Sequence, residues 1–218
     1  MRLQIGLAVL MLAEIAQGQP LWQPPALTPG REQQPQVTHA ESSAIRITSI
    51  NVAGYPVALE RTPLQDAHVY LGGVVGHEGE AGGSLIWLCY LQPNRQPPTW
   101  ILWLEQRGDL YNPSVVSGFQ WQTLPARSVP DARCKSLPPT GKVSLPVPIR
   151  LGQSRAAIVH LLGAPTAEYP QALVYSASRQ KKIIGTSGAH TFTEIETIAV
   201  NFDHGKVAAI NVYKATTD

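Results

Sequence analysis

The chain has 218 residues, 44% of them hydrophobic, and a formal net charge of only +2. This hydrophobic share excludes a wholly disordered chain, and the low charge excludes the dense basic surface that nucleic-acid binding requires. The 19 prolines and 18 glycines follow no regular period, which excludes a collagen-like chain.

The N-terminal residues have the order of a secretory signal peptide. One early positive charge precedes an apolar run over residues 3–12, and the small residues Ala16 and Gly18 end the segment. We therefore predict a signal peptide over residues 1–18 and an exported protein, periplasmic or secreted. No cysteine follows the predicted cleavage site, so we expect no lipid anchor. An uncleaved amphipathic N-terminus is the alternative, because Glu14 lies close to the apolar run.

Residues 19–43 are dense in proline and glutamine, and we predict an extended linker there. A first folded unit is expected over residues 44–128. It opens with a strand at 45–52, where apolar and polar residues alternate. A helix should follow, because residues 62–65 have the pattern of a capping box and Gly72 with Gly73 would stop it. Further strands are predicted at 85–91, 100–106 and 116–124.

A second folded unit is expected over residues 149–218, after a proline-punctuated connector at 129–148. Its helix would open at residues 152–154 and end at Gly163, which is followed closely by a proline. Strands are predicted at 173–178, 195–203 and 206–213, and a tight hairpin should join the last two through His204 and Gly205.

The two cysteines, Cys89 and Cys134, favour a disulfide in an exported chain. A reactive or metal-binding thiol pair is the alternative, but the wide separation of the two residues gives no metal-ligand spacing. We therefore predict a structural disulfide that holds the connector on the strand at 85–91.

The two predicted helices can be aligned with each other. Placing residues 61–73 over 151–163 matches Val69 with Val159 and Gly73 with Gly163. We therefore predict an α+β fold of two tandem units, each a short helix packed on an antiparallel β-meander.

The second unit also resembles a known family. Gly152, Ser154, Val159, Leu162, Gly163 and Pro165 form a helix motif that is followed by a strand containing Tyr175 and by a terminal hairpin. This pattern looks like the outer-membrane-assembly lipoproteins of the SmpA/OmlA type and the β-lactamase inhibitor proteins. The resemblance implies helices on one face of an antiparallel sheet and protein binding by the other face or the loops.

The same alternation predicts which side chains such an open face would present. Along residues 100–106, Leu102 and Leu104 share the covered face and Trp103 points to the open one. Aromatic side chains are frequent at protein-binding hot spots. The candidate binding residues are Trp103, Tyr175, Tyr213 and Tyr90. The alternative is that these rings are packed under loops or between the units.

Catalytic patterns are weak in this chain. Ser187 with His190 does not form a nucleophile elbow, and His77 with Glu78 and Glu80 lacks a third metal ligand. His160 and His204 are expected on a helix surface and in a turn.

We therefore expect no catalytic residues, cofactor or metal, and we predict a non-enzymatic module of the cell envelope or the exterior that binds a protein partner. The rival hypothesis is a small-ligand carrier or hydrolytic enzyme that uses the groove between the two units, with His77 or Ser187 contributing.

Overall fold

The computed structural model describes residues 23–25, 37–38, 47–80, 83–95, 98–108, 114–125, 128–185 and 188–217. The predicted signal peptide and most of the predicted linker lie outside the described residues. The described part of the chain is mostly β, with 51% of its residues in strands and 11% in helices. The predicted α+β class is therefore wrong.

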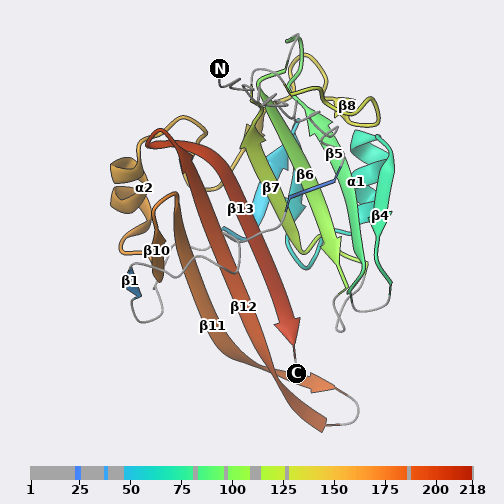
Figure 1. Cartoon of the computed structure of the whole chain (residues 1–218). Coiled ribbons are helices and arrows are strands. Elements are labelled where there is room, and N and C mark those ends of the chain that lie inside the picture. Colours follow the sequence, from blue (N-terminus) through green and yellow to red (C-terminus); the bar gives the residue numbers. More distant parts are fainter. Residues whose placement is uncertain are drawn as a thin grey trace, which may run out of the picture.

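A single ten-stranded sheet dominates the molecule (Figure 1). Along the sheet the strand order is β1-β10-β11-β12-β13-β7-β6-β5-β4, with every neighbouring pair antiparallel, and β8 pairs parallel with β5. Its strands are β1 (Val37–Thr38), β4 (Val75–Glu78), β5 (Leu85–Leu91), β6 (Trp100–Arg107), β7 (Gly118–Thr123), β8 (Lys135–Ser136), β10 (Ala167–Tyr169), β11 (Ala172–Gly185), β12 (Gly188–Asp203) and β13 (Lys206–Thr217).

The two predicted units do not form separate sheets. Strand β7 from the first pairs with β13 from the second, with Trp121 opposite Ile210 and Phe119 opposite Val212. One hydrophobic core runs beneath both halves of the joined sheet. This pairing overturns the predicted tandem of separate helix-on-meander units.

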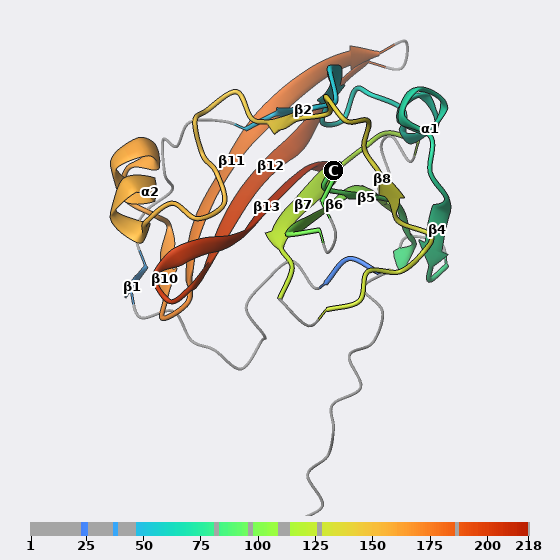
Figure 2. The same cartoon turned by 90° about the horizontal axis from the view of Figure 1, so that it is seen from above.

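One face of the large sheet, here called the core face, is covered by a small sheet of order β3-β2-β9 and by α1 and α2. Figure 2 shows α1 and α2 at opposite ends of the molecule, with β2 above the large sheet. These covering elements are β2 (Ser49–Val52), β3 (Tyr55–Ala58), β9 (Val143–Ser144), α1 (Leu64–Leu71) and α2 (Arg155–Leu162).

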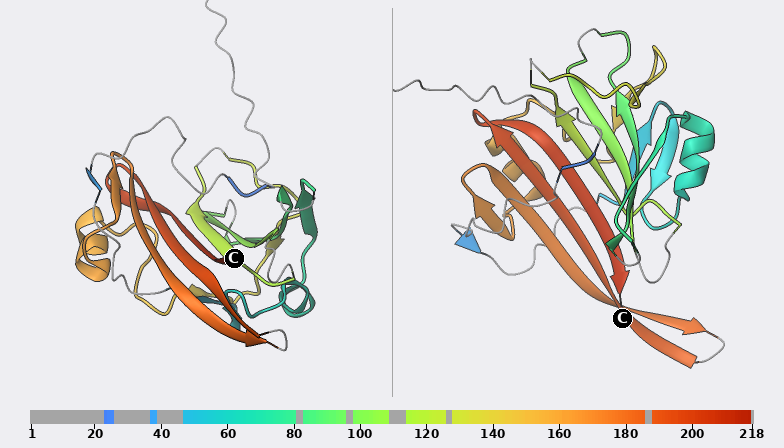
Figure 3. Two further views of the ribbon diagram at one scale, coloured as in Figure 1. Left: turned by 90° about the horizontal axis from the view of Figure 1, so that it is seen from below. Right: turned by 45° about the vertical axis from the view of Figure 1, so that its right-hand side comes forward.

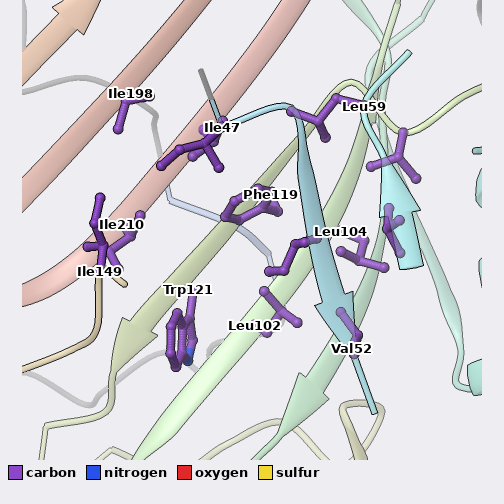
Figure 4. Packing of buried hydrophobic residues seen from close by; sticks show 14 of the residues in the cluster. Ile47, Val52, Leu59, Leu102, Leu104, Phe119, Trp121, Ile149, Ile198 and Ile210 are labelled. Atoms are coloured by element: carbon purple, nitrogen blue, oxygen red, sulfur yellow. The ribbon is translucent and has the colours of Figure 1, made fainter. Parts of the chain in front are cut away.

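Period-two alternation decides which residues reach the core, since successive side chains of a strand point to opposite faces. Leu102 and Leu104 of β6, Phe119 of β7 and Ile210 of β13 are fully buried on the core face, as Figure 4 shows. They belong to the same hydrophobic cluster as Val52 of the small sheet. The predicted facing of β6 is therefore confirmed.

The helix ends differ in part from the prediction. Ser154 caps α2 as expected, because its hydroxyl accepts a hydrogen bond from the Ala157 N–H at 3.3 Å. No side chain caps α1, and the Thr62 hydroxyl instead accepts the Ala58 N–H at 2.9 Å. The predicted capping box is therefore wrong. The residue that follows α1 is Gly72, one position before the glycine that the alignment matched with Gly163.

The predicted hairpin at residues 203–206 is confirmed, with Asp203 opposite Lys206. Both turn residues, His204 and Gly205, have positive φ, as a tight hairpin of this kind needs. Strands β11 and β12 are much longer than predicted. Because β13 ends opposite Thr193, the last part of the β11–β12 hairpin pairs only with itself and projects from the molecule (Figure 3).

The predicted disulfide is present between Cys89 in β5 and Cys134 just before β8. The two Cα atoms lie 4.6 Å apart. The bond ties the residues before β8 to the sheet, and β8 then pairs with β5 through Lys135 opposite Tyr90.

Candidate functional site

The face of the large sheet opposite the core face is here called the outer face. It carries the side chains that alternate with the core residues of β5, β6, β7 and β13. They include Trp87, Trp103, Glu105, Gln120, Asn211 and Tyr213.

The four predicted binding residues do not share one face. Trp103 and Tyr213 belong to the outer face, whereas Tyr90 and Tyr175 lie in the hydrophobic core and are 0% and 1% exposed. Tyr90 donates its hydroxyl proton to the Gly72 carbonyl at 3.0 Å, and Tyr175 donates to the Gly163 carbonyl at 3.3 Å. Both tyrosines therefore tie a strand to the end of a helix.

Trp103 is on the outer face but fully buried. It belongs to a second hydrophobic cluster that includes Trp87, Ile101 and the Cys89–Cys134 disulfide. Tyr213 is half-buried, and its ring centroid lies 6.0 Å from the Arg107 guanidinium carbon. We call the outer-face surface between Trp103 and Tyr213 the floor of the site. It is apolar near β5 and polar near β13.

A short N-terminal segment of the chain, Gln23–Pro25, lies on this floor. The Gln120 side-chain amide donates a hydrogen bond to the Pro25 carbonyl at 2.7 Å, and the Gln23 side chain donates to Glu78 of β4. Pro24 between them is buried. Figure 1 draws the segment in blue in front of the large sheet, and Figure 2 shows it on the side away from β2.

Sequence reasoning missed this contact. The segment falls in the proline-rich stretch predicted as a linker, and nothing in its composition indicates packing. The only usable signal was Gln120 itself, a polar residue between the apolar Phe119 and Trp121 of a buried strand, which requires a hydrogen-bond partner.

Three polar side chains of the outer face belong to adjacent strands, and one of them, Gln120, contacts the segment. Glu105, Gln120 and Asn211 are 0%, 0% and 5% exposed. Among the described residues, Glu105 Oε1, Gln120 Oε1 and Asn211 Oδ1 have no hydrogen-bond partner. Buried acceptors are nearly always paired in native proteins, so three unpaired neighbours on one face are candidates for contact with a bound group.

Glu105 is the charged member of this group. Its Oε2 accepts hydrogen bonds from Arg107 Nη2 at 2.7 Å and Nε at 3.1 Å. Burial raises the pKa of the Glu105 carboxyl, and the Arg107 charge and the neighbouring Arg107 and Gln120 side chains act in the opposite direction. A carboxylate kept in such an unfavourable place is typical of a binding position.

The other candidate residues are not brought together. His77 and Glu78 lie exposed on β4, and Glu80 is exposed just beyond it. His190 stands in β12 opposite Ile183, and Ser187 lies outside the described residues. Within the described part of the chain, no group of three metal-ligating side chains is assembled.

His160 is exposed on α2, as predicted. His204 is exposed in the turn, where its Nδ1 lies 2.9 Å from Asp203 Oδ1.

A separate groove of about 470 Å³ lies at the start of β6. Trp100 and Trp121 form one wall, with their ring centroids 6.1 Å apart in an edge-to-face contact. Residues 143–151 form the rest of the lining, which is mainly apolar. The groove holds no polar pair suited to acid–base chemistry.

Comparison of the chain with family models, curated proteins and solved structures found no match. The resemblance to the assembly lipoproteins and inhibitor proteins therefore stays a prediction. Among the described helices, none is both long and apolar enough to cross a membrane.

Proposed function

We propose that this chain is an exported, non-enzymatic protein-binding module whose outer face binds an extended segment of a partner protein. The observation that carries the proposal is the seating of Gln23–Pro25, in which Gln120 donates to a main-chain carbonyl and Pro24 is buried. Because every peptide has main-chain carbonyls, the Gln120 amide can donate the same hydrogen bond to any extended segment. In this structure the chain's own residues 23–25 occupy the site, and we call them the resident segment.

The floor of the site suits this task. Trp103 and Trp87 are held rigidly by the cluster around the disulfide, and rigid aromatic floors lose little conformational entropy on binding. Gln120 and Asn211 stand at the middle of the sheet, on β7 and β13, where the backbone is fixed by pairing on both sides. A partner segment would therefore meet a preformed surface.

Two further observations support the part of the proposal that concerns export. The disulfide is of the kind that persists in oxidising compartments, and the N-terminal residues have the order of a signal peptide. Mass analysis of the mature protein tests this part, since we expect an N-terminus after Gly18 and no free thiol. A reduced, full-length chain in the cytoplasm would contradict it.

Peptide binding can be tested by making the resident segment removable. A specific protease site is placed between Pro25 and Val37, the folded chain is cut, and the released piece is separated. A labelled peptide with the sequence of residues 19–27 is then titrated back. We expect saturable binding that Gln120→Leu weakens about tenfold, because one hydrogen bond is lost.

Gln122→Leu is the matched control. Gln122 lies on the same strand and the same face, opposite Ala209, and forms no described contact with the segment. The peptide should bind this variant as it binds the parent chain. Equal weakening by both substitutions, or no binding to the cut chain, would contradict the proposal.

A further inference from the structure

The three unpaired acceptors belong to three adjacent strands. Asn211 of β13 is directly opposite Gln120 of β7, which in turn is opposite Trp103, two residues from Glu105 on β6. Since neighbouring strands are about 4.8 Å apart, the three residues span about 10 Å across the sheet. All three side chains point to the outer face, so they can contact the same bound segment.

The resident segment cannot pair these atoms with its proline residues. Proline has no N–H, so Pro24 and Pro25 contribute only carbonyl acceptors, and Gln120 already uses its amide on one of them. Glu105 Oε1, Gln120 Oε1 and Asn211 Oδ1 are therefore left unpaired while the segment is in place. The segment binds the Gln120 amide but supplies no donor to the three acceptors.

An occupant that meets these needs must supply several donors and no negative charge. Arginine is the side chain that does so, because its guanidinium spreads its N–H donors over a flat fork and remains charged. Lysine carries its donors on one nitrogen atom and cannot reach acceptors on three strands together. An acidic segment would add acceptors to a site that already has too many.

The neighbours of Glu105 leave room for a second guanidinium. Arg107 binds only Oε2, so Oε1 is available as a second acceptor of the same carboxyl group. The Arg107 side chain is 28% exposed, so its guanidinium stays partly hydrated at the edge of the site. Gly118, opposite Glu105, adds no side chain between Glu105 and Tyr213.

We infer that the partner of the outer face is a protein segment that places an arginine over Glu105, Gln120 and Asn211 and thereby displaces Gln23–Pro25. This inference rests on the proposed function. The resident segment then competes with the partner for the outer face. A partner segment displaces it only when it donates more hydrogen bonds to the site.

The test uses the cut chain and three labelled peptides. One has the sequence of residues 19–27, and the other two replace Pro24, the buried proline, by arginine or by lysine. We expect the arginine peptide to bind about tenfold more tightly than the parent peptide, and the lysine peptide to gain much less. Glu105→Gln should remove most of the arginine preference, measured as the ratio of the affinities of the arginine peptide and the parent peptide for the same variant.

Glu168→Gln is the control, since Glu168 also pairs with an arginine, Arg155, at 3.3 Å but lies on β10 away from the site. It should keep the full arginine preference. If Glu105→Gln does not fold, Asn211→Ala serves instead, with a partial loss of preference expected.

Equal binding of the three peptides, or an arginine preference that survives loss of the acceptors, would overturn the inference and leave the proposed function standing. Failure of all three peptides to bind would overturn the proposed function itself. Unfolding of the chain when the segment leaves would show that Gln23–Pro25 is part of the fold, and would also overturn the inference.

Discussion

At the scale of single residues, Lys214 forms a largely buried ionic cluster with Glu60 and Glu194. Lys214 Nζ of β13 lies 3.3 Å from Glu60 Oε2 and 3.2 Å from Glu194 Oε2. The three side chains are 11%, 10% and 1% exposed, and the Thr216 hydroxyl also donates to Glu60 at 3.0 Å. Lys214 therefore bridges β12 and the chain just after β3.

Removal of this bridge should be strongly destabilising. Lys214→Met removes the cation that Glu60 and Glu194 share, while Glu194 keeps its ion pair with Arg179. We expect the free energy of unfolding to fall by about 2 kcal/mol. Lys206→Met is the matched control, because Lys206 begins the same strand and is exposed. Urea denaturation of both variants measures the difference, and equal stabilities would show that the bridge contributes little.

Glu105 should leave a signature in the pH dependence of stability. Burial raises its folded-state pKa above the ordinary value of 4.5, so above that pH the native state holds a proton that the unfolded state has lost. The parent chain should therefore lose stability relative to Glu105→Gln as pH rises through this window. Denaturation of both chains between about pH 4 and pH 8 measures this, and the opposite slope would mean that Arg107 outweighs burial.

Residue facing was predictable where a strand was long and uninterrupted. The alternation along β6 placed Leu102 and Leu104 in the core and Trp103 outside it, because the period of two is set by the backbone. The facing of Tyr90 was missed, although Cys89 beside it belongs to the outer cluster and successive residues point to opposite faces.

At the scale of elements, the two core tyrosines make comparable contacts with the ends of α1 and α2. Burial raises the pKa of both hydroxyls, that of Tyr175 to about 12, so each remains a neutral donor. Tyr90→Phe and Tyr175→Phe should each lower stability by about 1 kcal/mol, because a buried carbonyl loses its partner. Tyr70→Phe, at an exposed position on α1, should change nothing measurable by thermal unfolding.

The disulfide should contribute more than either tyrosine. It closes a loop with a sequence separation of 45 residues, and the chain-entropy relation predicts about 4 kcal/mol of stabilisation. Replacing both Cys89 and Cys134 by alanine should lower the denaturation midpoint accordingly. Reducing agent should destabilise the parent chain and leave the double variant unchanged, and a parent chain indifferent to reduction would contradict the prediction.

The join between β7 and β13 explains why the fold class was mispredicted. Local patterns identified both helices and most long strands, but a two-unit arrangement would have left β7 and β13 as exposed edges. Pairing them removes two unprotected edges and fuses the two cores into one. Such long-range pairing has no signature in either segment alone.

At the scale of the whole molecule, the outer face is a surface that the chain itself partly covers. The predicted open sheet is present as a face, but Trp103 is buried and Gln23–Pro25 is bound across it. The short β1 pairs with β10 at the opposite edge of the sheet. No pattern in residues 19–43 could predict this, because packing of a proline-rich segment depends on the surface it meets.

The most direct test of a preformed binding surface compares the side-chain amide signals of Gln120 and Asn211 in nuclear magnetic resonance spectra. The spectra are recorded before and after the segment Gln23–Pro25 is cut and removed. We predict that both signals shift while those of the core residues Leu104, Phe119 and Val212 stay in place. Unchanged amide signals would mean that Gln23–Pro25 does not occupy the face. Loss of the core signals would mean that the segment belongs to the fold, and either result would contradict a preformed binding surface.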